Sequence, residues 1–105
     1  MGDPRMTQVT ALVLRSVAAG HAFGFDVMER CGLPSGTVYP ALRRLERAGW
    51  LVAEWEDADA ARAEGRPRRK TYALTQRGRR GMPEAEAKLT EVERLLRDAP
   101  APRGA

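Results

Sequence analysis

The chain has 105 residues, of which 18 are Lys or Arg and 14 are Asp or Glu, so its net charge is +4 and its isoelectric point is about 10.0. A chain of this length buries one modest core, and its basic balance suits a nucleic acid or an acidic surface as partner. With one cysteine, one histidine and no grouped nucleophile, base and orienting residue, the sequence argues against a disulfide, a metal centre, a cofactor and an enzymatic role. We find neither a secretory leader nor an apolar run of the roughly 18 residues that a membrane helix needs, and therefore expect a soluble cytoplasmic protein.

Two helices are predicted in the first third of the chain. Residues 6–19 have apolar side chains around most of the helical circumference, which predicts a first helix that is covered on two sides. Gly20 ends this helix, and residues 23–31 are predicted to form a second, short helix. Residues 32–34 then make a tight turn into the next helix.

Residues 35–47 predict an amphipathic helix with a basic face, and Ser35 is its expected N-cap. At about 100° per residue, one side of the helix collects apolar residues and the other side begins with small residues and continues with arginine. The apolar stripe is Val38, Ala41, Leu42, Leu45 and Ala48, and the opposite face is Gly36, Tyr39, Pro40, Arg43, Arg44 and Arg47. Because helix N-termini and arginines both favour phosphate, this pattern indicates a helix that enters a DNA groove. A surface helix with solvated arginines is the alternative.

Pro40 conflicts with this helix if the helix begins near Ser35. A proline in a helix interior removes a backbone hydrogen bond and costs about 3 kcal/mol. We therefore expect a distorted first part or a later start of the helix. The helix at residues 35–47, the short turn and the second helix together form a predicted helix-turn-helix.

Residues 50–75 predict a β-hairpin with basic residues. Residues 50–56 alternate as a strand, and residues 68–75 have the β character of a second strand. Residues 57–67, rich in Ala, Asp and Arg, are predicted to be a mobile loop. A helix-turn-helix followed by a basic hairpin is a winged helix, and two basic elements on one small domain favour DNA binding. An ordinary hairpin with solvated arginines is the alternative.

The last predicted helix covers residues 76–97 and is capped by Thr75. Its apolar residues recur at spacings of three and four, as in a coiled coil, along a seam formed by Met82, Ala85, Leu89, Val92 and Leu96. We expect the seam to pack against the same helix of a second copy and against the partner's first helix, which predicts a homodimer. A seam that folds back on its own domain is the alternative. Pro83 is compatible with a regular helix from about Gly81, and residues 98–105 are predicted to be a flexible tail.

Two segments resemble a known family. Residues 33–51, with the core Gly-Thr-Val-Tyr-Pro at 36–40, resemble the recognition-helix segment of PadR-like transcriptional regulators, and residues 70–78 resemble the junction that follows their wing. The similarity covers about residues 6–97 and implies a homodimeric winged-helix repressor of the small subtype, which dimerises through a single terminal helix. It also implies that the wing arginines reach the minor groove or the backbone, and that the groove or its phosphates are faced by Thr37, Tyr39, Arg43 and Arg44.

These observations predict a mainly α (α+β) fold, with a winged helix-turn-helix and a two-stranded wing at residues 1–75 and a C-terminal dimerisation helix at residues 76–97. The predicted DNA contacts on the recognition helix are Ser35, Gly36, Thr37, Tyr39, Arg43, Arg44 and Arg47. Those on the wing are Arg66, Arg68, Arg69 and Lys70. The predicted function is a sequence-specific homodimeric repressor that binds a palindromic operator in double-stranded DNA. A winged-helix module that binds a protein instead of DNA is the alternative, and an enzyme is the third hypothesis.

The sequence assigns no effector site. The resemblance implies release by a flat aromatic compound in the dimer interface, yet the terminal helix contains no Trp, Tyr or Phe. Four other aromatic residues could line a pocket, although their helix and strand spacing is more typical of core residues: Trp50, Trp55, Phe23 and Phe25. A redox-sensing role for Cys31 is a further alternative, which the raised thiol pKa expected on burial disfavours.

Overall fold

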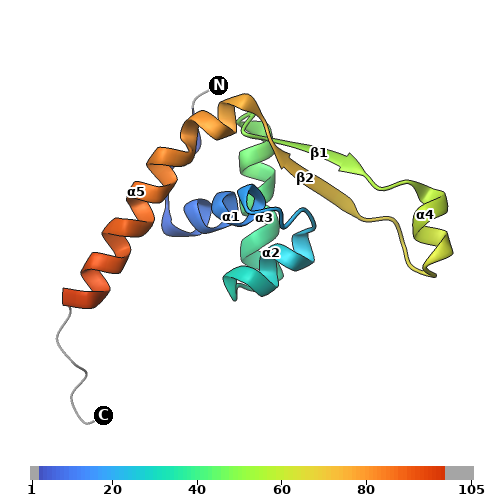
Figure 1. The fold of residues 1–105 in the computed structure, drawn as a ribbon, viewed down its shortest axis with the longest axis horizontal. Coiled ribbons are helices and arrows are strands. Elements are labelled where there is room, and N and C mark those ends of the chain that lie inside the picture. The colour runs from blue at the N-terminus through green and yellow to red at the C-terminus, as the bar shows by residue number, and fades with distance from the viewer. Residues whose placement is uncertain (1–2, 99–105) are drawn as a thin grey trace, which may run out of the picture.

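The structure, a computed structural model, describes residues 3–98 (Figure 1). Its elements are, in chain order, α1 (Gln8–Ala18), α2 (Gly24–Cys31), α3 (Ser35–Arg47), β1 (Leu51–Trp55), α4 (Ala58–Ala63), β2 (Lys70–Leu74) and α5 (Gln76–Asp98). The two strands form one antiparallel sheet. This mainly helical chain with a two-stranded wing confirms the predicted winged helix-turn-helix fold.

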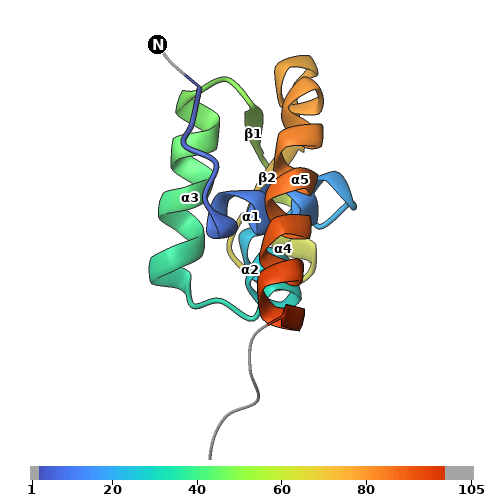
Figure 2. The ribbon, with the colours of Figure 1, turned by 90° about the vertical axis from the view of Figure 1, so that its left-hand side faces the viewer.

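Helix α1 forms the centre of the core. The Thr7 hydroxyl caps it by accepting a hydrogen bond from the backbone N–H of Thr10 at 3.1 Å. Its buried apolar side chains are Ala11, Val13, Leu14 and Val17. The helix packs against α2, α3 and α5, and Figure 2 shows it between α3 and α5. A first helix that is covered on more than one side is therefore confirmed.

The turn between α2 and α3 uses one residue with a left-handed backbone. Gly32 has φ 66° and its N–H donates to the carbonyl of Met28 at 2.9 Å, which ends α2. Pro34 then occupies the N-cap position of α3, and its carbonyl accepts from the N–H groups of Thr37 and Val38 at 3.0 and 3.1 Å. The prediction of Ser35 as N-cap is wrong by one residue, because Ser35 is already the first residue of the helix.

Helix α3 begins at Ser35 and runs without interruption through Pro40, so the prediction of a later start is wrong. The missing N–H of Pro40 would have bonded to the carbonyl of Gly36, four residues earlier. Gly36 is exposed and has no side chain, so that carbonyl is open to water, which can replace the lost partner. The proline is tolerated because the lost hydrogen bond faces solvent.

The wing pairs Leu51 with Leu74 at its base and Trp55 with Lys70 at its outer end. Both strands are shorter than the ranges predicted for them. The predicted loop at residues 57–67 contains a helix, α4, which is a correction. Alanine has the highest helix propensity, and the carboxylate of Asp57 caps α4 by accepting from the N–H of Asp59 at 3.4 Å. Ala61 is the one buried residue of this short helix.

Helix α5 begins at the end of the wing. The Thr75 hydroxyl accepts from the N–H of Gly78 at 3.0 Å, which confirms the predicted cap, and donates to the carbonyl of Gly49 at 2.6 Å. The helix is regular from Gln76 through Pro83, so a start near Gly81 is wrong. Gly78 and Gly81 are buried against Trp50, at positions where a Cβ atom would overlap the backbone carbonyl or the indole ring of that tryptophan. These two glycines let α5 pack directly on the core.

The apolar seam of α5 is divided between two environments. Ala85 and Leu89 are buried in the core of their own domain, where α5 packs along α1, and Met82 is half-buried against the same core. The prediction that the whole seam packs against a second copy is therefore wrong for Met82, Ala85 and Leu89. Farther along, Val92 is half-buried, and the end of α5 projects away from the other helices in Figure 1. Asp98, predicted to belong to the tail, ends α5, and the rest of the predicted tail lies outside the described residues.

Candidate nucleic-acid interface

Burial of one side of α3 fixes which side chains face outward. Val38, Ala41, Leu42 and Leu45 are fully buried, as the predicted apolar stripe requires. The opposite face exposes Arg43, Arg44 and Arg47, and none of these arginines forms an ion pair with a carboxylate in residues 3–98. Their positive charge is therefore uncompensated within the described part of the chain and is available to an anionic partner.

The first turn of α3 adds backbone donors to this face. Ser35 and Gly36 are exposed, Thr37 is half-buried, and no side chain caps the helix N-terminus. The N–H groups of a first turn lack helical acceptors, and the helix dipole makes that end favourable for an anion. All seven residues predicted on the recognition helix thus belong to one outward face and its leading edge.

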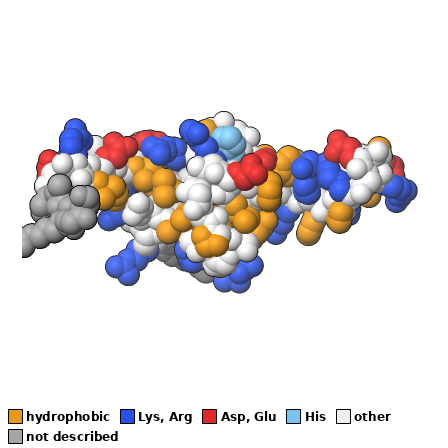
Figure 3. Space-filling view, turned by 90° about the horizontal axis from the view of Figure 1, so that it is seen from below, with side chains coloured by type: hydrophobic (Ala, Val, Ile, Leu, Met, Phe, Trp, Pro, Cys, Tyr) orange, Lys and Arg blue, Asp and Glu red, His pale blue; other side chains and the backbone are white. Residues whose placement is uncertain are grey.

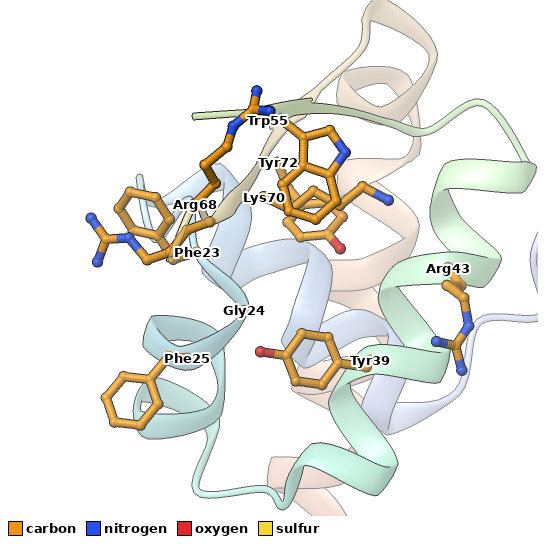
Figure 4. A pocket seen from close by; sticks show the side chains of 10 residues that line it. Phe23, Gly24, Phe25, Tyr39, Arg43, Trp55, Arg68, Lys70 and Tyr72 are labelled. Carbon is orange, nitrogen blue, oxygen red and sulfur yellow. The ribbon is translucent and has the colours of Figure 1, made fainter. Parts of the chain in front are cut away.

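Tyr39 is held in place by a glycine of the preceding helix. A Cβ atom on Gly24 would lie 2.5 Å from Cε1 of the Tyr39 ring, so the two helices approach closely only because residue 24 has no side chain. Figure 4 shows the ring reaching from α3 toward α2. The sequence indicated Tyr39 by its place on the polar face, but nothing local indicated that Gly24 positions it.

Within the wing, the carboxylate of Glu56 forms ion pairs with two of the predicted DNA-binding residues, Arg66 and Arg69. Arg66 forms a two-pronged ion pair with Glu56, with Nη2 donating to Oε2 at 2.7 Å, and its Nε donates to Glu64 at 2.8 Å. Nη2 of Arg69 lies 3.3 Å from Glu56 Oε2. Only 23% of the Arg66 side chain is exposed, and its guanidinium is held by Glu56 and Glu64. Arg66 therefore stabilises the wing, and we no longer expect it to contact a phosphate.

This cluster should make the wing sensitive to acid. Hydrogen bonds from Arg66 hold the pKa of Glu56 at about 2, against an ordinary value of 4.5, and Glu56 in turn raises the pKa of Arg66 above its usual range. A depressed carboxyl pKa stabilises the folded form above about pH 4.5, and that contribution is lost as the pH falls from 4.5 toward 2. We expect the N–H of Glu56, which donates to the Arg69 carbonyl, to lose protection from hydrogen exchange across this range.

The matched control is Glu56→Gln, which removes the titrating group. In this variant protection should be weaker at neutral pH and should change little between pH 4.5 and 2. Amide exchange measured by NMR at several pH values tests both expectations. An unchanged acid transition in Glu56→Gln would assign it to another carboxylate.

The remaining basic residues of the wing lie at the surface, and each contacts a neighbouring group. Arg68 donates from Nε to the Glu56 carbonyl at 2.8 Å and has no ion-pair partner in residues 3–98. The guanidinium of Arg69 lies 3.7 Å from the centre of the Phe23 ring, and Nζ of Lys70 lies 3.5 Å from Glu46. Figure 3 shows Lys and Arg side chains along the wing, next to hydrophobic ones. Exposed basic side chains thus occur on both α3 and the wing, although the wing also carries acidic residues such as Glu56 and Glu64.

The aromatic residues that the sequence left unassigned divide between core and surface. Trp50 is buried under α5, whereas Trp55 and Phe25 are exposed by 61% and 60%. Trp55, Phe23 and Phe25 line a hollow beside α3, so the preference for a core position is wrong for Trp55 and Phe25. Tyr72, which the sequence identifies only as a strand residue, also lines the hollow.

Cys31 is half-buried at the end of α2. Its thiol donates to the Leu12 carbonyl at 3.6 Å, and burial raises the pKa of the thiol. Because the thiolate is the reactive form, this environment disfavours oxidation at neutral pH.

The fold and this surface define a winged helix-turn-helix domain whose recognition helix presents arginines without an ion-pair partner in residues 3–98, beside a wing that carries further basic residues. Residues 13–84 match the model of the transcriptional regulator PadR-like family. The chain therefore belongs to the PadR-like family of transcriptional regulators, as the resemblance of its recognition-helix segment implied. No curated protein sequence matches the chain. None of the helices in residues 3–98 has the length and hydrophobicity that spanning a membrane requires.

Solved structures share the fold at low sequence identity. A PadR family transcription regulator from Clostridium difficile is 18% identical with a TM-score of 0.69, over 87% of this chain and 96% of that one. BpsR of Bordetella bronchiseptica, whose DNA binding is regulated by 6-hydroxynicotinic acid, is 19% identical with a TM-score of 0.71, over 97% and 73%. ZitR of Lactococcus lactis, in complex with DNA, is 20% identical with a TM-score of 0.59, over 90% and 58%.

Proposed function

We propose that the protein is a sequence-specific DNA-binding repressor that acts as a homodimer and is released by a small molecule. The observation that carries this proposal is the unpaired arginine face of α3, formed by Arg43, Arg44 and Arg47 beside the basic wing. Phosphate contacts from such residues supply affinity, and side chains that reach base edges supply specificity. The DNA complex of the structurally similar ZitR supports duplex DNA as the partner.

The dimer is proposed to form through the outer half of α5. Leu95 and Leu96 are exposed by 64% and 71%, and the other elements in residues 3–98 do not cover this part of the helix. Adjacent exposed leucines on a projecting helix favour burial against a second copy. We therefore retain Val92 and Leu96 from the predicted seam and add Leu95, while Ala85 and Leu89 serve the monomer core. Dyad-related recognition helices would then enter successive major grooves roughly 34 Å apart on a palindromic operator.

Repression follows from occupation of a promoter by this dimer. A ligand that binds one arrangement of the two protomers better than another shifts the distance between their recognition helices, and so weakens operator binding. The regulation of BpsR DNA binding by 6-hydroxynicotinic acid, a small aromatic acid, supports release by a small molecule.

A protein-binding winged helix is the second candidate. It would also present an exposed face on α3, but it has no need of basic residues on both α3 and the wing. Arg43 on α3 and Arg68 on the wing line the same hollow, and basic residues on both elements favour DNA.

Two alanine variants test the division between base and phosphate contacts. Arg43→Ala should lower affinity for the operator more than for random duplex, since a bidentate pair with guanine contributes about 1–3 kcal/mol of discrimination. Arg68→Ala should weaken both DNAs by the same factor, because a phosphate contact carries no sequence information. Titrations of both duplexes by fluorescence anisotropy measure the difference. Equal losses for Arg43→Ala would place that residue among the phosphate contacts.

A further inference from the structure

A hollow of about 460 Å³ lies between α2, α3 and the wing. Its volume falls within the roughly 300–1,000 Å³ of sites that bind small molecules. Aromatic side chains from all three parts line it, namely Phe23, Phe25, Tyr39, Trp55 and Tyr72. Figure 4 shows Trp55 and Tyr72 on the wing side of the opening and Tyr39 across from them on α3.

The aromatic walls suit a flat, unsaturated ligand. Tyr72 is buried in the middle of β2, whereas Trp55 is exposed by 61%, so the Trp55 indole gains contact area if a ligand enters. The Tyr39 ring is seated against Gly24 and offers a fixed opposing surface. Offset stacking between such rings favours planar aromatic ligands over saturated ones of the same size.

The charges around the hollow select an anion. Arg43, Arg68, Arg69 and Lys70 line it, and no acidic residue of the described chain does so. Arg69 and Lys70 are already paired with Glu56 and Glu46, which leaves Arg43 and Arg68 without an ion-pair partner in residues 3–98. Guanidinium groups bind carboxylates with charge-assisted hydrogen bonds.

We propose that this hollow binds a planar aromatic carboxylate of one or two rings, and that the bound ligand competes directly with DNA. This inference rests on the proposed DNA-binding function, because Tyr39, Arg43 and Arg68 belong both to the hollow and to the proposed DNA-facing surface. A carboxylate that binds Arg43 or Arg68 occupies a group that a phosphate or a base would use. Release from DNA then needs no change in the spacing of the recognition helices.

The first experiment uses 2-naphthoate and the full chain. The protein contains two tryptophans, so its proton–nitrogen NMR spectrum has two indole signals, one from the exposed Trp55 and one from the buried Trp50. Titration with 2-naphthoate should move the Trp55 signal with saturation and leave that of Trp50 in place. The uncharged 2-naphthalenemethanol and the non-planar cyclohexanecarboxylate should each bind at least roughly tenfold more weakly. Equal shifts of both signals, or none, would overturn the site.

Variants connect the signal to the lining residues. Arg68→Ala and Trp55→Leu should each weaken 2-naphthoate binding by roughly tenfold. Because Trp55→Leu removes the reporting indole signal, its affinity is measured by calorimetry. Arg15→Ala is the matched control, because Arg15 lies on α1 next to Glu86 of α5 and should not affect the ligand. The Trp50 signal reports whether each variant keeps its fold. Unchanged affinity in both lining variants would also overturn the site.

The second experiment measures DNA binding at low salt with increasing 2-naphthoate. Competition predicts that the apparent Kd for DNA rises linearly with ligand concentration without reaching a plateau, whereas an effector that only shifts helix spacing gives a plateau. A plateau, or no effect while the Trp55 signal is saturated, would overturn direct competition. Failure to bind DNA without ligand contradicts the proposed function instead, and the Trp55 titration then still decides whether the hollow is a ligand site.

Discussion

Raising the salt concentration from 50 to 200 mM should weaken binding to the operator by about 10³–10⁵-fold. This range applies to a protein that makes roughly 6–10 phosphate contacts, which a dimer reaches if each protomer uses three to five of its basic groups. The recognition helix offers Arg43, Arg44 and Arg47, and the wing adds Arg68 and Lys70. Each contact releases condensed counterions from the DNA, and this release is what salt opposes.

The measurement is an anisotropy titration of a labelled operator fragment and a scrambled fragment at several salt concentrations. Arg47→Ala should reduce the slope of log K against log salt by about two units in a dimer, one for each lost contact. Arg15→Ala removes the same charge beside Glu86 of α5, away from α3, and should leave the slope unchanged. The specific fragment should exceed the scrambled one by at least about 10³-fold. Failure to bind either fragment at low salt would favour the protein-binding alternative.

Replacing Leu95 and Leu96 together with Glu should abolish the dimer and weaken operator binding by about 10²–10⁴-fold. The two leucines are largely exposed in the single chain, so the change costs little in the monomer fold but buries unpaired charge in the proposed interface. A half-site held by one protomer then lacks the tethered second contact. Sedimentation velocity measures the association, and anisotropy measures the affinity.

The matched control for this prediction is Val52→Glu. Val52 is another exposed apolar residue, but it lies on β1 of the wing, so this variant should stay dimeric. Leu89→Glu is unsuitable as a test, because Leu89 is buried in the core of its own domain and its loss would unfold the monomer. A double variant that remains dimeric would contradict the assignment of the outer half of α5.

Local patterns in the sequence determined the helix-turn-helix and its basic face. The apolar residues of α3 recur with the helical period, so the buried side and the arginine side follow from spacing alone. The same holds for the cap at Thr75, where one hydroxyl and one N–H three residues apart complete the contact. The recognition-helix segment also carried enough family-specific residues to indicate the PadR-like family, which the match over residues 13–84 confirms.

Tertiary structure decided which of these residues are free to act. Arg66 and Arg68 are both wing arginines, yet of these two only Arg66 forms an ion pair with the carboxylate of Glu56, ten residues earlier in the chain, whereas Arg68 contacts the Glu56 backbone carbonyl. Half of the apolar seam on α5 packs on α1, more than sixty residues away, a choice that the periodicity of α5 does not specify. The hollow beside α3 likewise joins residues from α2, α3 and both strands. Periodicity states which side of an element is apolar, whereas the partner of that side depends on contacts between segments distant in sequence, and these exist only in the folded chain.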